Sequence, residues 1–176
     1  FNSSKAHIPN AVSLPMAHKT QPSTVGDMSH SSPLRVSRWL KAYQAMLTAR
    51  LVDTQEASLI AQGEASFHVS GGGHEGSALL AEYLRPEDYL HLHYRDKALM
   101  LARGLPIAQF FHSLLGTAGS HSQGRQMSAH ISDPARHILS IVGPVGNHAL
   151  QAAGVAASLK ERASGGLVIC SLGDGT

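Results

Sequence analysis

The sequence predicts an α/β protein in which helices flank a parallel sheet, with a long helix and a polar arm ahead of it. Two patterns favour this class. Apolar residues recur at helical spacing from Leu34 onward, and residues 137–172 have the pattern of strand, glycine turn, alanine-rich helix and second strand. A strand–helix–strand unit joins parallel strands by a right-handed crossover, and ligands bind beyond the carboxyl ends of such strands.

An arm and a long helix are expected first. Residues 1–33 are rich in Ser, Pro, His and Asn without a sustained period, which is typical of disorder or of an arm lying on another surface. Residues 34–176 form the amino-terminal part of the α/β domain, and their first helix starts after Pro33 and runs to Gly63, a natural carboxy-terminal cap. Helical spacing predicts an amphipathic helix with an apolar series of Val36, Trp39, Leu40, Tyr43, Leu47 and Leu51.

Shorter elements are expected from residue 67 onward. The predicted helices span residues 74–84, 96–103, 106–115 and 147–163, and the predicted strands span residues 89–94, 137–142 and 167–172. The glycines of residues 70–73 permit close approach of the backbone to another group. Residues 116–133 form a polar loop longer than the usual connection, so we expect it to be functional or mobile.

Composition excludes several classes of function. The formal charge is only +2, and no window combines basic with aromatic residues, so no nucleic-acid partner is expected. No stretch approaches the ~18 apolar residues of a membrane helix, so no membrane partner is expected. The single Cys170 cannot form an internal disulfide, and the start of the chain has no secretory pattern, so we expect a cytoplasmic protein. Both ends look cut, so we expect a piece of a longer protein.

Two glycine turns are candidates for ligand binding. Gly173-Asp174-Gly175 follows a predicted strand, where the carboxylate could ligate a divalent cation and the glycines could admit a diphosphate; a plain turn fits equally well. Residues 143–146 lack the G-x-G-x-x-G pattern, which disfavours a nicotinamide dinucleotide. The histidines, including the pair His91 and His93, have no cysteine or acidic companion at ligand spacing, so they predict no metal site.

Five short sequence motifs, called motif words below, occur together in a characteristic order. They are Ser66-Phe67, Gly73-His74-Glu75, Tyr94-Arg95-Asp96, Gly124-Arg125-Gln126-Met127 with His130, and Gly173-Asp174-Gly175. Their order and spacing resemble the α subunits of branched-chain 2-oxo-acid dehydrogenases, from about residue 34 to residue 176. The resemblance implies a truncated thiamine diphosphate-binding fold. It also implies oxidative decarboxylation of a branched-chain 2-oxo acid, with transfer of the acyl group to a lipoyl arm.

The resemblance also implies cofactors and partners. Thiamine diphosphate and Mg²⁺ would be the cofactors, and a β subunit or fused β half would complete the site in a heterotetramer that works with a lipoyl-bearing acyltransferase. Several members hold K⁺ at the turn before the alanine-rich helix. Here His148 stands in that stretch and has no oxygen to give, which puts a potassium site in doubt.

The resemblance implies a role for each residue that matches a motif of the family. Tyr94 and Arg95 would contact the diphosphate, and Gly143 and Val145 would border the aminopyrimidine. Asp174 would ligate the magnesium ion. The remaining implied positions are Gly175 and Thr176 at the diphosphate, His130 at the active-site entrance as a group that steers the substrate, Phe67 as a wall of the acyl pocket, and His93 either near the cofactor or packed on its strand.

Other functions remain open from the sequence. A pyruvate or acetoin dehydrogenase α subunit carries similar words, and a transketolase-like enzyme is a more distant alternative. A non-catalytic nucleotide- or anion-binding module, or a chain used only as an assembly surface, could be built on the same elements.

Overall fold

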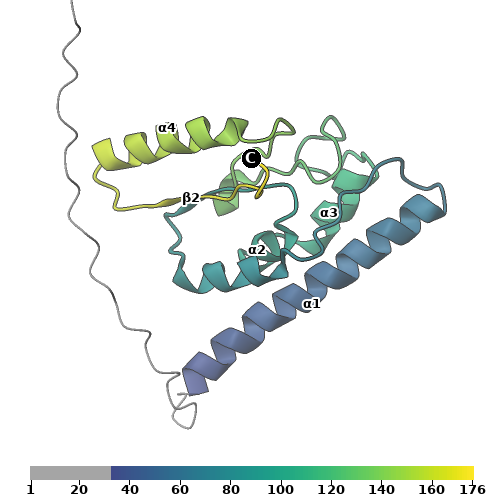
Figure 1. The fold of residues 1–176 in the computed structure, drawn as a ribbon, viewed down its shortest axis with the longest axis horizontal. Coiled ribbons are helices and arrows are strands. Elements are labelled where there is room, and N and C mark those ends of the chain that lie inside the picture. The colour runs from purple at the N-terminus through teal and green to yellow at the C-terminus, as the bar shows by residue number, and fades with distance from the viewer. Residues whose placement is uncertain (1–32) are drawn as a thin grey trace, which may run out of the picture. The chain divides into compact units, whose positions relative to one another are not determined.

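The computed structural model describes residues 33–176, so the predicted arm, apart from Pro33, lies outside the described residues. The elements in chain order are α1 (Pro33–Ala61), η2 (Glu75–Tyr83), β1 (Tyr89–His91), α2 (Lys97–Ala102), α3 (Ile107–Leu114), η3 (Pro134–Arg136), α4 (Asn147–Glu161) and β2 (Val168–Cys170). Helix α4 packs on one side of the strands. On the other side, η2, α2 and α1 pack against one another (Figure 1). Helices around a small parallel sheet confirm the α/β class.

The sheet is centred on β1. It pairs in parallel with β2, with Leu90 opposite Ile169. On its other side, the Leu90 amide donates to the His137 carbonyl at 2.9 Å, and the Leu90 carbonyl accepts from the Leu139 amide at 2.8 Å. The segment around Ile138 therefore runs parallel to β1, and β1 lies between the two segments that the sequence pattern joins through α4.

The predicted strand over residues 137–142 is wrong in its extent. Only Ile138 makes a parallel bridge to β1, and Ile138 also pairs in antiparallel fashion with Asp133 across the η3 turn. His137 has a φ of 55°, in the left-handed region, because it closes that turn. The strand expected over 167–172 is β2, which is half-buried rather than fully buried because, among the described residues, β1 is its only strand neighbour.

Helix α1 confirms the predicted long helix but packs through a different face. Its buried residues are Ala42, Ala45, Ala49, Val52 and Glu56. Ala45 and Ala49 pack with Ala78 of η2 and Ala98 of α2, and these small side chains allow close approach of the helices. The six residues of the predicted apolar series are instead between 41% and 69% exposed in the described unit.

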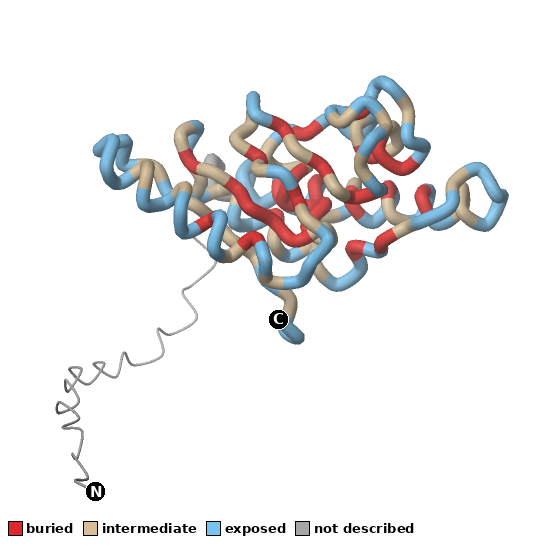
Figure 2. Tube along the Cα trace, turned by 90° about the horizontal axis from the view of Figure 1, so that it is seen from above, coloured by how far each residue is buried: buried red, intermediate tan, exposed pale blue. Residues whose placement is uncertain are grey.

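The main core lies between the strands and helices α2 and α3. It contains Leu90, Leu92, Leu99, Met100, Phe110, Ile131, Ile138 and Ile141, all at most 3% exposed. Figure 2 shows these buried segments running through the interior of the unit. Within residues 33–176, no helix combines the length and apolar character needed to cross a membrane.

Candidate active site

A cavity of about 400 Å³ opens beyond the carboxyl end of β1. Its lining includes Phe67, Tyr94, Arg95, His130 and Gly143, which come from segments far apart in the sequence. All five were predicted as site residues. Their meeting follows from the parallel sheet, because Tyr94 follows β1 and Gly143 follows the neighbouring segment at the same sheet edge.

Asp96 fixes the turn that carries Tyr94 and Arg95. Its buried carboxylate accepts hydrogen bonds from the His93 amide at 3.2 Å and from the Ser171 hydroxyl. The Ser171 hydroxyl oxygen in turn accepts from the His93 amide at 2.7 Å. The ends of β1 and β2 are thus tied together behind the cavity. Asp96 was part of a motif word, but its anchoring role was not predicted, and Ser171 carried no sequence signal.

Arg95 is a half-buried cation at the rim of the cavity. Its Nη1 donates to the Ser70 carbonyl at 2.6 Å, and its guanidinium carbon lies 5.4 Å from the centre of the Tyr94 ring. A guanidinium has five N–H donors, so others remain for a ligand. This arrangement suits a phosphate or carboxylate, which binds arginine through paired, charge-assisted hydrogen bonds.

Two histidines flank Tyr94 and differ in their surroundings. His93 is buried, its ring centre lies 3.9 Å from that of Tyr94, and it does not line the cavity. Burial, opposed in part by Asp96, lowers the pKa of the His93 imidazole, so it is neutral at pH 7. His130 Nδ1 donates to the Ser128 carbonyl at 2.9 Å, because a carbonyl only accepts. Within the described residues, His130 Nε2 therefore remains available to a ligand.

The carboxy-terminal turn adjoins the other glycine turn without lining the cavity. A Cβ on Gly146 would lie 2.9 Å from the Thr176 methyl carbon, so the two turns meet closely. Asp174, Gly175 and Thr176 are exposed, and so is Val145. The structure therefore leaves these four predicted residues outside the 400 Å³ cavity. His93 contacts both the cavity residue Tyr94 and the carboxy-terminal turn. Its ring centre lies 3.9 Å from that of Tyr94, and its Nε2 would lie 3.8 Å from a Cβ on Gly173.

His148, in the first turn of α4, uses its side chain in a contact within the protein. His148 is buried, and its Nε2 donates to the Ser171 carbonyl at 2.7 Å. Its imidazole therefore joins α4 to the end of β2. The side chain offers no oxygen to a cation.

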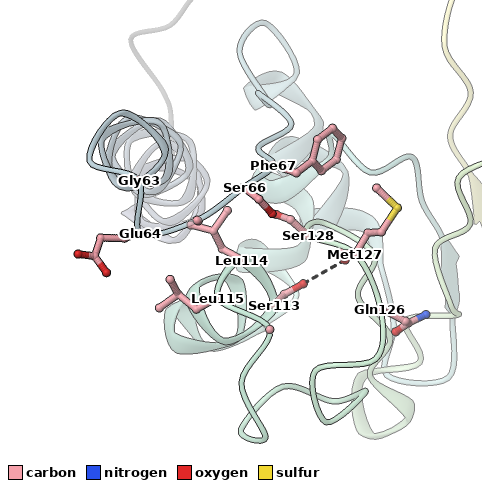
Figure 3. Close-up of a pocket in the computed structure, with 12 residues that line it drawn as sticks. Gly63, Glu64, Ser66, Phe67, Ser113, Leu114, Leu115, Gln126, Met127 and Ser128 are labelled. Carbon is pink, nitrogen blue, oxygen red and sulfur yellow. Dashed lines mark hydrogen bonds between the residues drawn. The ribbon is translucent and has the colours of Figure 1, made fainter.

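A second cavity of about 670 Å³ adjoins the first (Figure 3). Phe67 and Met127 line both cavities, and both side chains are exposed. The rest of the second lining comes from residues 63–66, 113–116, 126 and 128. Phe67 thus lies at the boundary between the two cavities, and its role as a wall of the acyl pocket remains a prediction. Met127 was named only as part of a sequence motif.

Comparison with known proteins yields one family and a set of relatives. Residues 43–176 match the family described as Dehydrogenase E1 component. The chain is 28% identical over 137 residues to 2-oxoisovalerate dehydrogenase subunit alpha 1, mitochondrial, of Arabidopsis thaliana, covering 77% of this chain and 29% of that protein. It is 29% identical over 138 residues to the corresponding alpha subunit of Caenorhabditis elegans, covering 77% and 32%. It is 32% identical over 133 residues to pyruvate dehydrogenase E1 component subunit alpha of Staphylococcus aureus, covering 75% and 34%.

The chain spans about a third of the length of these curated relatives. Their names include both 2-oxoisovalerate and pyruvate, at similar identity, so the similarity does not separate the two substrates. The family match covers most of the described residues, including every segment that lines the first cavity. The resemblance seen in the motif words is confirmed, and the chain belongs to the dehydrogenase E1 component family.

Proposed function

We propose that the protein carrying this chain is the α part of a thiamine diphosphate-dependent 2-oxo-acid dehydrogenase. It would decarboxylate a branched-chain 2-oxo acid oxidatively and pass the acyl group to a lipoyl arm. The observation that carries the proposal is the meeting of Tyr94, Arg95 and His130 around one cavity at the strand ends, in a chain of the E1 family.

The residues present fit a cofactor that carries a diphosphate. Arg95 supplies a cation, and among residues 33–176 only the Ser70 carbonyl takes one of its five N–H donors. Gly143 lines the cavity beside His130, where an added Cβ would lie 3.3 Å from Nε2, so the lack of a side chain lets the backbone approach a ligand there. The exposed carboxylate of Asp174 suits Mg²⁺, which binds through one or two carboxylates together with water and phosphate oxygens.

Each predicted cofactor-binding residue then has a role toward one part of thiamine diphosphate or its metal ion. Arg95 and Tyr94 bind the diphosphate, Asp174 holds the magnesium ion, and Gly143 borders the aminopyrimidine. Val145 joins Gly143 in this role, and Gly175 and Thr176 lie at the diphosphate. Thiamine diphosphate, when bound, supplies the electron sink that allows carbon dioxide to leave.

Two other residues that line the cavity would contact the substrate. His130 would face the substrate through Nε2, because Nδ1 already donates to the Ser128 carbonyl. Phe67 would supply an apolar wall for the acyl chain.

The proposal includes partners and a location. The β subunit or fused β half would complete the site, and a lipoyl-bearing acyltransferase would receive the acyl group. The names of the relatives, which describe alpha subunits and an E1 component, support this assembly. The cytoplasmic location predicted from the sequence remains a prediction.

Arg95→Ala should weaken binding of thiamine diphosphate with Mg²⁺ by about 1.5–3 kcal/mol, the range for a hydrogen bond to a charged group. Arg95→Lys should restore only part of the affinity, because an ammonium cannot form the paired contact. Calorimetric titration of the full protein measures both. Arg162→Ala, at the exposed far end of α4, removes the same charge and should leave affinity unchanged. Full affinity in Arg95→Lys would contradict the paired contact.

Branched-chain 2-oxo acids should have higher kcat/KM values than pyruvate. Each additional methylene in an apolar pocket contributes about 1–3 kcal/mol to discrimination, and Phe67 supplies such a wall. A side-by-side assay of pyruvate and 2-oxoisovalerate on the full protein with its partners measures the ratio. A preference for pyruvate would replace the branched-chain assignment with a pyruvate one.

A further inference from the structure

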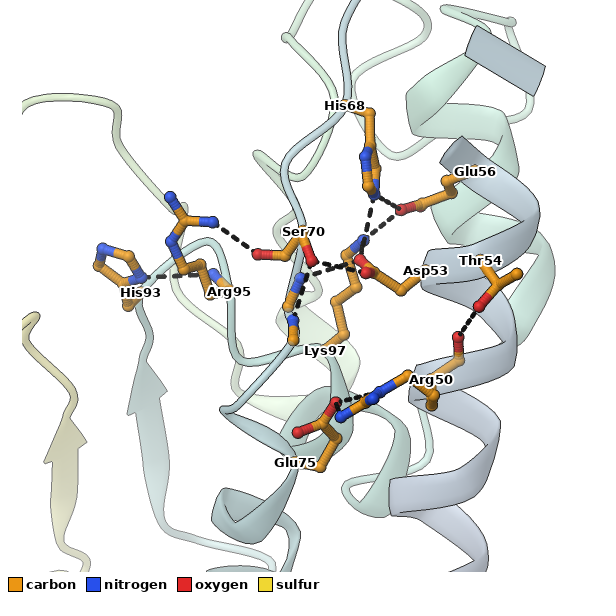
Figure 4. Close-up of polar contacts among 12 residues, drawn as sticks. Arg50, Asp53, Thr54, Glu56, His68, Ser70, Glu75, His93, Arg95 and Lys97 are labelled. Carbon is orange, nitrogen blue, oxygen red and sulfur yellow. Dashed lines mark hydrogen bonds and ion pairs between the residues drawn. The ribbon is translucent and has the colours of Figure 1, made fainter. Parts of the chain in front are cut away.

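Helices α1 and α2 enclose a buried ion cluster, which we define as Asp53, Glu56 and Lys97 (Figure 4). Lys97 is only 1% exposed, and its Nζ donates to Asp53 Oδ1 at 2.8 Å and to Glu56 Oε2. Burying three charges carries a large desolvation cost, which mutual attraction must offset. A cluster of this kind fixes the positions of its members because separating them would leave a charge in the interior without its counter-ion.

Asp53 also holds the loop that crosses the cluster. Its Oδ2 accepts from the Ser70 hydroxyl at 2.7 Å, and its Oδ1 accepts from the Gly71 amide at 2.8 Å. His68 Nε2 lies 3.1 Å from Oδ1. Burial alone would raise the pKa of the Asp53 carboxyl, but the hydrogen bonds from Lys97, Ser70 and Gly71 hold that pKa well below its ordinary value. Asp53 is therefore an anion that accepts from every side.

The same loop contacts Arg95 directly. The Ser70 carbonyl accepts from Arg95 Nη1 at 2.6 Å. A Cβ on Gly71 would lie 2.9 Å from the Arg95 carbonyl oxygen, so the two backbones approach as closely as glycine allows. Residues 67–70 also line the 400 Å³ cavity. The loop thus has the cavity on one side and the Asp53 carboxylate on the other.

The cluster is not a candidate metal centre. Ligand atoms of Asp53, Glu56 and His68 lie within 4.8 Å of one another, a spacing compatible with a metal ion. The Lys97 ammonium contacts both carboxylates, so a cation already occupies the place that a metal ion would take. The chemistry of the cluster is therefore that of an internal anchor.

We propose that Asp53 is a positioning residue for Arg95. Its carboxylate, held by Lys97, fixes the Ser70 carbonyl, and that carbonyl fixes the Arg95 guanidinium with its remaining donors available to the cavity. An arginine held in advance loses less side-chain freedom when an anion binds, so affinity rises without a new contact to the ligand. The inference rests on the proposed function, in which Arg95 binds the cofactor diphosphate.

A double-mutant cycle in the full protein tests the proposal. Asp53→Asn keeps the size of the side chain but removes the charge and one acceptor oxygen. We expect it to weaken binding of thiamine diphosphate with Mg²⁺ about tenfold, within the range for coupled neighbours. In an Arg95→Ala background, where no guanidinium remains to be positioned, the same change should alter affinity by less than about twofold. Calorimetric titration of the four proteins gives the coupling.

Glu56→Gln is the matched control, because Glu56 also pairs with Lys97 but makes no hydrogen bond to Ser70 or Gly71. It should leave cofactor affinity within about twofold of wild type, even where it lowers thermal stability. If Asp53→Asn does not fold, Ser70→Ala carries the same test, since it removes the hydroxyl bond to Asp53 and keeps the carbonyl. Its loss of affinity should also vanish without Arg95.

The outcomes distinguish the positioning role of Asp53 from the proposed binding of the diphosphate by Arg95. Losses that add in the double mutant, an unchanged affinity in Asp53→Asn, or an equal loss in Glu56→Gln would each overturn the positioning role and leave the proposed function standing. An unchanged affinity in Arg95→Ala would overturn the diphosphate role of Arg95, and with it the basis of the inference.

Discussion

Replacing Lys97 by methionine should lower the free energy of unfolding by about 3–5 kcal/mol, the usual cost of leaving buried charges without their partner. Methionine fills a similar volume, so the loss reflects charge rather than a cavity. Asp53 and Glu56 would then face each other's charge in the interior. Urea unfolding of the full protein, compared with wild type, measures the change.

Two further variants show that the effect belongs to the cluster. Lys41→Met, at an exposed position of the same α1 helix, should change stability by no more than about 0.5 kcal/mol. Combining Lys97→Met with Asp53→Asn and Glu56→Gln should recover part of the loss, because no buried charge remains unpaired. A loss below about 1 kcal/mol in Lys97→Met would show that the carboxylates find other compensation.

The cost in Lys97→Met should also depend on pH in a defined direction. Burial already raises the pKa of Glu56, against the attraction of Lys97, and removing the lysine raises that pKa further. A group whose folded-state pKa is raised binds protons more tightly in the folded state, so its contribution to stability falls as pH rises through that pKa. The difference from wild type should therefore shrink as the pH is lowered toward the Glu56 pKa.

Asp174→Ala should abolish magnesium-dependent binding of thiamine diphosphate. A hard divalent cation prefers carboxylate oxygen, and within residues 33–176 Asp174 belongs to no group of three or more potential metal ligands that could replace it. Titration with the cofactor in the presence of Mg²⁺, and again with a chelator, measures the metal-dependent part of the affinity. The wild type should lose affinity with chelator, and the variant should already be at that lower level.

Glu161→Ala is the control for this change, because it removes an exposed carboxylate at the far end of α4. It should bind the cofactor and Mg²⁺ as the wild type does. An Asp174→Ala protein with undiminished, magnesium-dependent affinity would remove Asp174 from the metal site and assign that turn a purely structural role.

Much of the fold could be predicted because the strongest patterns are local. The long α1 helix and the alanine-rich α4 helix are readable from spacing, and the parallel pairing of β1 with β2 follows from the strand–helix–strand order. The strand expected around Ile138 was overestimated, because its run of apolar residues does not reveal the antiparallel turn with Asp133. The packing face of α1 depends on Ala78 and Ala98, which lie far along the chain.

Some residues of the candidate site could also be predicted from the sequence, and others could not. Tyr94, Arg95, His130 and Gly143 were predictable because motif words mark them and a parallel sheet gathers strand ends at one edge. The buried ion cluster was missed because two helices far apart in the sequence supply it, and a lysine within an apolar helix is more often at the surface. One signal was present. Asp53 and Glu56, three residues apart, continue the stripe that buries Ala49 and Val52, and acids on a buried stripe require a cation.

The buried ion cluster also has a consequence for behaviour on heating. The desolvation penalty of buried charges falls as temperature rises, because the hydration of ions carries a strongly negative entropy, whereas apolar stabilisation levels off. The contacts that hold the loop of Ser70 and Gly71 beside Arg95 are an ion pair and hydrogen bonds donated to the Asp53 carboxylate, so we expect them to weaken less than the surrounding apolar packing. On warming, this corner of the molecule should keep its geometry until the whole unit melts.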